Sequence, residues 1–217
     1  MLRLTTFCLL LFASFHLCKA QQPLPADLRL PNIGKWLEKS DGEPADWLGQ
    51  KVQNKELIEP INVVIIDSFA TSPQEAIHKL LSECRKDGYK DKKGHSWGYL
   101  ATVDSIRVSQ LPDERKKALS NRNFLFTNNH GRIMGPQYYD GKYIFVGAFS
   151  REAFRLFNKA HHIYRSFLAA RNDFSERLDH GHTYKIIGEY NLENSLDDDY
   201  LTTGDHDGYA ILLYAEK

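Results

Sequence analysis

The chain has 217 residues, of which 42% are hydrophobic and 26% charged, with 28 basic against 28 acidic side chains. This composition predicts one packed domain and excludes a disordered chain, a collagen-like chain and a coiled coil. The balanced charge gives no strong overall attraction to nucleic acid or to anionic lipid.

Residues 1–20 have the pattern of an export signal. The basic residue Arg3 precedes an apolar run over residues 7–15, and Ala20 is a small residue at the end of the segment. Such a segment is typical of a secretory signal peptide, and it is shorter than the about 20 apolar residues that a spanning helix needs. We therefore expect cleavage after Ala20, a secreted or periplasmic protein, and no stable membrane span after processing. An uncleaved anchor is the alternative.

Cysteine usage is consistent with that expectation. Removal of the signal leaves Cys84 as the one cysteine, so no internal disulfide can form. Cys84 shares one face of a predicted helix with Ile77, Leu80 and Leu81, which indicates a buried, small apolar side chain. A reactive thiol is the alternative, but no neighbouring basic group would favour the thiolate.

The first half of the chain predicts an arm, a strand and a helix. Residues 21–59 are rich in proline and glycine and form an arm that packs through Trp36 and Trp47. The β-branched run 61–67 predicts a central strand covered on both faces. Thr71, Ser72, Pro73 and Glu75 are typical of a helix start, so we expect a helix that runs to Lys86 and stops near Gly88.

The second half predicts mostly strands, with two further helices. We expect an α+β fold, in which a mixed, largely antiparallel sheet carries helices in a single layered domain. The predicted boundaries are a signal peptide at 1–20, an arm at 21–59 and the domain proper at 60–217. The elements are a strand or ordered loop at 95–103, a polar helix at 113–120, a hairpin of strands 123–134 and 142–149 joined across 135–141, a mostly helical stretch at 150–179, and strands at 183–190 and 209–214.

Two histidines could form part of a metal site. His180 and His182 would point to the same face if they lay on a strand, a geometry that zinc and iron sites use. A polar turn with its bend at Gly181 is the alternative. A third ligand would have to come from elsewhere in the chain, and the candidates are His130, His161, Asp205 and His206.

Other sites for ions and cofactors are disfavoured. The acidic stretch 197–207 does not fit a calcium loop, because Tyr209 and Ala210 fall where an oxygen ligand and a glycine are required. The chain also contains no nucleophile elbow, phosphate loop or dinucleotide fingerprint. We assign no metal ion and no cofactor to it.

The richest polar cluster combines histidines and arginines. If the long predicted helix packs on the strand before it, their imidazoles and guanidinium groups would suit a phosphate or carboxylate. We therefore predict His130 and His161 as candidate catalytic residues, and Asn129, Arg132, Arg171 and Asn172 as ligand-binding residues. The alternative is structural: Arg171 would pair with local acids, Asp173 with Arg177, and His161 would cap a helix.

Six segments follow one another between residues 59 and 178: Pro60-Ile-Asn-Val-Val, Ser109-Gln-Leu-Pro, Asn129-His-Gly-Arg132, Val146-Gly-Ala-Phe-Ser150, His161-His-Ile163 and Ala169-Ala-Arg171-Asn172. In this order they resemble the domain found at the C-terminus of LssY proteins. The resemblance implies a bacterial envelope setting beside membrane-embedded phosphatase-like or transport-like modules, but no established reaction. Where that family tends to have acidic residues in the His-to-Arg helix, this chain has Ser166, Leu168 and Ala170, and Arg165 replaces a proline.

Two functions follow as hypotheses. The first is an exported, envelope-associated accessory domain that recognises an anionic group of a small molecule, lipid headgroup or glycan through the histidine and arginine patch, with no nucleic acid partner. The second is a phosphoester hydrolase in which His130 or His161 acts as acid, base or nucleophile and the arginines stabilise negative charge. The sequence predicts no oligomeric state.

Overall fold

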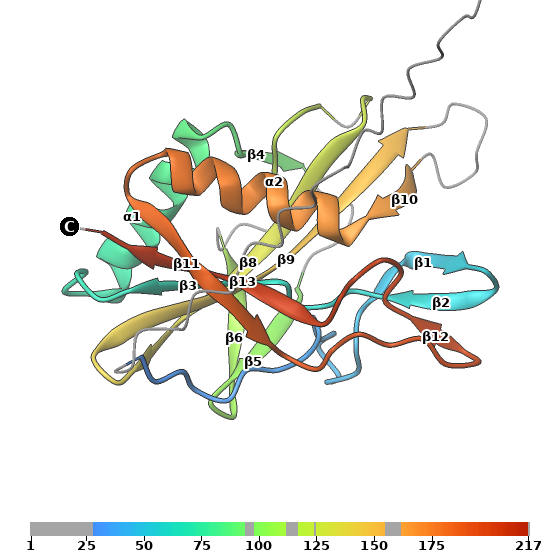
Figure 1. Ribbon diagram of the computed structural model, residues 1–217, viewed down its shortest axis with the longest axis horizontal. Helices are drawn as coiled ribbons and strands as arrows, with labels where there is room; N and C mark the ends of the chain where they lie inside the picture. The colour runs from blue at the N-terminus through green and yellow to red at the C-terminus, as the bar shows by residue number, and fades with distance from the viewer. Residues whose placement is uncertain (1–27, 94–97, 112–116, 124, 155–161, 217) are drawn as a thin grey trace, which may run out of the picture.

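A ten-stranded mixed sheet forms the centre of an α+β fold (Figure 1). The computed structural model describes residues 28–93, 98–111, 117–123, 125–154 and 162–216. The main path of the sheet runs β11 (Tyr184–Asn191), β13 (Tyr209–Ala215), β3 (Val63–Asp67), β9 (Lys142–Phe154), β8 (Asn128–Tyr139), β6 (Ile106–Leu111) and β5 (Leu100–Val103), while β10 (His162–Ser166) pairs with β9, and β7 (Lys117–Ser120) pairs with β8 and with β4 (Lys90–Lys93).

Strand β3 lies in the middle of this sheet. It pairs antiparallel with β9 and parallel with β13, and all five of its residues are buried. An unbroken apolar run is what a strand covered on both faces requires, so the sequence prediction for residues 61–67 is confirmed. The strands predicted near β11 and β13 are also confirmed.

Two helices cover one face of the sheet (Figure 1). Helix α1 (Pro73–Lys86) begins where Ser72 Oγ accepts a hydrogen bond from the Glu75 amide at 3.2 Å, and its C-cap is Asp87. These bounds confirm the predicted helix, and Cys84 is buried on its inner side, where burial raises the pKa of the thiol. Helix α2 (Phe167–His180) begins at the Ser166 cap. No described helix is long and apolar enough to cross a membrane.

Side chains on the two faces of the sheet alternate along each strand. On β8, Ile133 packs beneath the helices, whereas Met134 belongs to the opposite face, which Ile33 and Leu37 of the N-terminal segment cover. On the helix side the rings of Phe149 and Phe174 stack with centroids 3.8 Å apart. A polar side chain of β8 can therefore contact α2 only if it lies on the helix side of the sheet.

A small second sheet extends one end of the fold. It contains β1 (Asp46–Val52), β2 (Lys55–Ile58) and β12 (Leu201–Thr202). Trp47 of β1 is buried against Leu57 and Phe167, as the arm prediction expected, whereas Trp36 is half-buried. This sheet brings the N-terminal part of the chain against the ends of β8, β9 and β10.

Three sequence predictions need correction. The predicted helix at 113–120 is wrong for residues 117–120, which form β7; residues 112–116 lie outside the described part of the chain. The predicted helix at 150–179 is wrong for residues 150–154 and 162–166, which belong to β9 and β10; residues 155–161 lie outside the described part of the chain. The β8–β9 hairpin exists, but it turns at Asp140 and Gly141, whose positive φ angles suit a two-residue turn.

Candidate functional site

A row of polar side chains lies at the end of β8 and β9, on the face away from the helices. In the antiparallel register His130 pairs with Ser150, and Asn128 pairs with Glu152, so all four side chains share one face. His162 of β10 faces the same carboxylate. We call these five residues the His130 row.

The distances within the His130 row connect a hydroxyl, an imidazole and a carboxylate. Ser150 Oγ lies 3.4 Å from His130 Nε2, and His130 Nδ1 lies 3.8 Å from Glu152 Oε2. The other oxygen of Glu152 lies 3.1 Å from His162 Nδ1 and accepts a hydrogen bond from Asn128 Nδ2 at 2.9 Å. The carboxylate is thus held between two imidazoles and an amide.

This order of groups is the one that activates a serine. A base beside the hydroxyl can take its proton, and a carboxylate behind the base orients the imidazole and stabilises its charged form. However, Ser150 is only 2% exposed, and its Oγ accepts a hydrogen bond from Trp47 Nε1 at 2.9 Å. A substrate would reach Oγ only after the Trp47 contact opens.

Arg132 lies on the same face of β8, and its positive charge is paired with an acidic residue in the interior. Its Nη1 lies 3.1 Å from Glu59 Oε2, and its guanidinium stacks 4.6 Å from the Tyr99 ring centroid. Burial raises the pKa of Glu59, Arg132 opposes that shift, and Asp46 adds to it. Both members of the pair are nearly inaccessible to solvent.

Arg171 lies on α2, on the other side of the sheet, and is also paired. Its Nη1 lies 2.7 Å from Asp207 Oδ1 and donates to the Tyr209 carbonyl at 2.6 Å. Burial would raise the pKa of Asp207, but the hydrogen bonds from Arg171 and from the Tyr209 amide hold it below its ordinary value. The structure therefore does not bring Arg132 and Arg171 together, because α2 covers the face opposite Arg132.

The remaining predicted ligand-binding residues are also separated. Asn129 points to the helix side of β8, where its Oδ1 accepts a hydrogen bond from Arg151 Nε at 2.6 Å. Asn172 is exposed on α2 and accepts a hydrogen bond from Arg171 Nε at 3.2 Å. His161 lies outside the described residues. Of the predicted site, His130 alone belongs to a described cluster that could transfer a proton.

The histidine pair considered for metal binding does not have strand geometry. His180 is the last residue of α2, and His182 lies in the following turn with a φ angle of 69°. Within the described ranges, no group of three histidine, cysteine, aspartate or glutamate side chains is placed to hold a metal ion. His206 is buried, with Nε2 2.7 Å from Asn194 Oδ1, and burial lowers its pKa to about 4.

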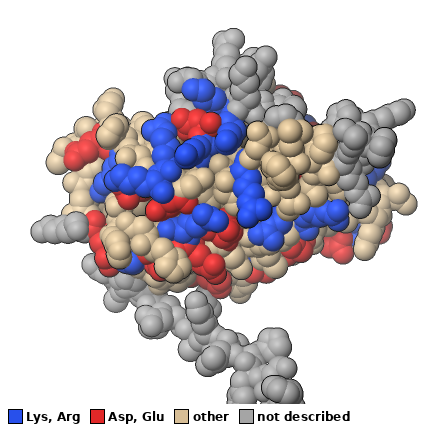
Figure 2. All heavy atoms as spheres, turned by 90° about the horizontal axis from the view of Figure 1, so that it is seen from above, with Lys and Arg blue, Asp and Glu red and all other residues tan. Residues whose placement is uncertain are grey.

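A second charged region, which the sequence analysis missed, lies on the surface. We call it the cationic face. It lies on the side of the molecule that carries α1, α2 and β4, which Figure 2 views from above. Lysine and arginine side chains gather there, with acidic side chains among them. Its exposed members are Arg85, Lys86, Lys90, Lys92, Arg122 and Arg177.

Contacts join these cations into one surface. Arg177 Nη1 donates to the Asp87 carbonyl at the end of α1, at 3.4 Å, and its Nε lies 3.0 Å from Asp173. Arg85 Nη2 lies 2.9 Å from Asp91 of β4. The Asp173 carboxylate also accepts a hydrogen bond from Asn121 Nδ2 at 3.0 Å, which ties the Arg122 loop to α2.

Half of the cationic face is neutralised by its neighbours. Arg85, Lys86 and Arg177 pair with Asp91, Glu83 and Asp173, respectively. Among the residues the structure describes, Lys90, Lys92 and Arg122 have no acidic partner within 4.0 Å. The sequence signal was present in the Arg85-Lys86 pair at a helix end and in the lysines of residues 90–93, but their common surface depends on the pairing of β4 with β7.

The fold and these two regions define an α+β domain with a buried polar row and an exposed cationic face. Comparisons with known proteins find no matching family model, no significantly similar curated protein and no significantly similar solved structure.

Proposed function

We propose that the protein is an exported accessory domain that binds an anionic group on its cationic face. The observation that supports this proposal is the presence of three exposed, acid-free cations, Lys90, Lys92 and Arg122, beside the paired Arg85 and Arg177. Anion recognition requires donors that solvent can reach, and Arg132 and Arg171 do not meet this requirement.

The paired arginines still contribute to such a surface. A guanidinium carries five N–H donors in a fixed plane, and one carboxylate occupies only some of them. Asp91 and Asp173 therefore orient Arg85 and Arg177 while leaving other donors toward solvent. Because the charges are exposed, the attraction to an anion falls as salt concentration rises.

The location in the proposal comes from the sequence. The signal-like segment 1–20 and the resemblance to LssY C-terminal domains both favour an extracytoplasmic setting at an envelope. In this setting the anionic group would belong to a lipid headgroup, a glycan or a small molecule.

Binding to a heparin oligosaccharide, used as a polyanionic probe, tests the proposal. Lys90→Glu combined with Lys92→Glu should weaken binding by about tenfold or more, because each substitution replaces an attraction with a repulsion at a cost of order 1 kcal/mol or more. Lys39→Glu combined with Lys51→Glu makes the same net charge change elsewhere and should alter binding less than about twofold. Absence of heparin binding by the wild type, or equal losses in both variants, would contradict the proposal.

A phosphoester or ester hydrolase is the second candidate. It is favoured by one observation, the sequence of contacts from Ser150 Oγ through His130 to Glu152. In this version His130 is the base, Ser150 is the nucleophile and Glu152 orients the imidazole. The enclosed position of Ser150 places this candidate second to anion binding.

A further inference from the structure

Two large apolar side chains are exposed at the end of the loop between β7 and β8. Leu125 is 52% exposed and Phe126 is 64% exposed, and they are adjacent in the sequence. We call these two residues the apolar tip. Single exposed apolar residues are common on protein surfaces, whereas contiguous exposed apolar surface with a polar rim is found at interaction sites.

The backbone holds the apolar tip in a defined turn. Asn123 Oδ1 accepts a hydrogen bond from the Leu125 amide at 3.1 Å, and the Asn123 carbonyl accepts one from the Phe126 amide at 3.0 Å. On the other side, Asn128 Nδ2 donates to the Phe126 carbonyl at 3.1 Å. These three hydrogen bonds tie the backbone of Leu125 and Phe126 to Asn123 and Asn128, while both side chains are exposed to solvent.

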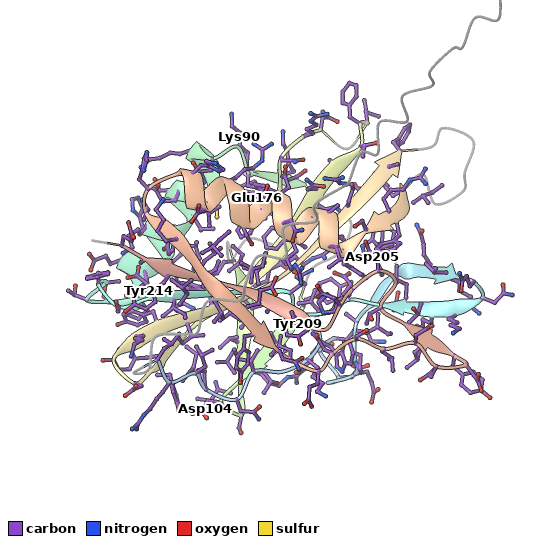
Figure 3. All side chains as sticks on the ribbon, in the orientation of Figure 1. Lys90, Asp104, Glu176, Asp205, Tyr209 and Tyr214 are labelled. Carbon is purple, nitrogen blue, oxygen red and sulfur yellow. The ribbon has the colours of Figure 1, made fainter. Side chains whose placement is uncertain are left out.

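The apolar tip belongs to the same side of the molecule as the cationic face. The loop leaves β7 at Ser120, which pairs directly with Lys90 of β4. Figure 3 shows Lys90 pointing outward on the side where α2 lies. Arg122 lies in the loop itself, and Asn121 is bonded to Asp173 of α2. The loop that carries the apolar tip is therefore joined to β4, which carries Lys90, and to α2, which carries Arg177.

We infer that this side of the protein docks on an anionic membrane, with the apolar tip inserted at the boundary between headgroups and acyl chains. The inference rests on the proposed function and names lipid phosphate as the anionic group. Phenyl and leucyl side chains gain free energy at that depth, while lysine and arginine meet the phosphates above them. A glycan or a free phosphate would use the cations but would leave the apolar tip in water.

The local arrangement also explains how a nearly neutral chain could bind an anionic surface. Overall charge is balanced at 28 basic and 28 acidic side chains, so attraction at a distance is small. Within a Debye length of about 8 Å, however, a membrane is affected by the nearest charges and not by the sum over the protein. Arg122 lies in the loop of the apolar tip, and Lys90 pairs with Ser120, where that loop leaves β7.

Sedimentation with lipid vesicles tests the inference. The purified chain, with its N-terminus determined by intact mass, is mixed with vesicles of phosphatidylcholine and phosphatidylglycerol in a 3:1 ratio or of phosphatidylcholine alone. Leu125→Ser combined with Phe126→Ser should reduce binding to the anionic vesicles by about fivefold or more, because two apolar side chains no longer leave water. The same variant should keep the wild-type affinity for heparin.

A matched variant controls for a general loss of apolar surface. Ile106→Ser combined with Tyr138→Ser changes two side chains that are 49% and 59% exposed on other hairpins. It should bind the anionic vesicles within about twofold of wild type. Thermal unfolding of each variant shows whether the fold is retained. All variants have the same N-terminus, so residues before the domain affect their binding equally.

The outcomes separate this inference from the proposed function. Heparin binding without vesicle binding would overturn the membrane inference and leave the proposed function standing. Absence of both would overturn both. Vesicle binding that survives in the Leu125 and Phe126 variant, or that is equal on neutral vesicles, would also overturn the inference. Loss of vesicle binding alone in that variant supports it.

Discussion

The His130 row with Arg132 and the cationic face contain the same kinds of side chain in opposite surroundings. Arg132 is paired with Glu59 in the interior, whereas Lys90 and Lys92 point to solvent from an edge strand. The interior arginine neutralises a buried carboxylate, and the surface lysines are exposed to solvent. Residue type therefore indicates what chemistry is possible, and burial decides whether a ligand or the protein itself uses it.

The largest expected effect is on the interior side of this comparison. Arg132→Met should lower the free energy of unfolding by about 3–5 kcal/mol, because it leaves the Glu59 carboxylate buried without its cation. Chemical denaturation at pH 7 measures the loss. Lys55→Met, which breaks the exposed pair with Asp197, should cost less than about 1 kcal/mol. Adding Glu59→Leu to Arg132→Met should recover much of the lost stability. If Arg132→Met and Lys55→Met lower the free energy of unfolding equally, the contrast between interior and surface is contradicted.

A second effect comes from the buried imidazole of His206. Because its pKa is about 4 in the folded chain and 6.5 ordinarily, the unfolded chain takes up a proton between these pH values while the folded chain does not. Stability is therefore lost as pH falls from 6.5 to 4, by about 3 kcal/mol from this group. Unfolding curves at pH 7, 5.5 and 4.5 measure the slope.

Two measurements isolate the His206 contribution. His206→Gln should flatten the dependence of stability on pH in that window, whereas substitution of the exposed His78 by glutamine should leave it unchanged. If the glutamine variant does not fold, NMR titration of wild type gives the same information. A His206 resonance that titrates near pH 6.5 would show the assignment to be wrong.

The third prediction concerns whether the His130 row catalyses hydrolysis. If the hydrolase candidate is correct, Ser150→Ala and His130→Ala should each lower hydrolysis of a generic ester or phosphoester by about 100-fold or more, because each removes a member of the proton-transfer chain. His180→Ala, at the exposed end of α2, is the control and should leave the rate unchanged. A wild type without activity, or rates that the first two substitutions do not change, would leave the row a structural network.

Local patterns in the sequence predicted several elements well. The β-branched run predicts β3, and the Ser72 cap predicts the start of α1, each from a few consecutive residues. The region 150–179 failed because a strand end, a second strand and a helix follow one another there, and their apolar residues together imitate a single helical spacing.

The arrangement of the candidate site depended on information that spacing does not contain. The sequence places Arg132 on a strand and Arg171 on a helix, but it does not state which face of the strand the helix covers. Because side chains alternate along β8, the face that receives α2 carries Asn129, and the other face carries His130 and Arg132. The cationic face was missed for a similar reason, since Lys90 meets the Arg122 loop only through strand pairing.

The pairing of β3 with β13 has a consequence for biogenesis. One neighbour of the central strand comes from residues 211–214, about 150 positions further along the chain. The ribosome must therefore release that late segment before the middle of the sheet can close, and long-range closure of this kind is slow. Until residues 211–214 have emerged, one edge of β3 therefore lacks its partner strand.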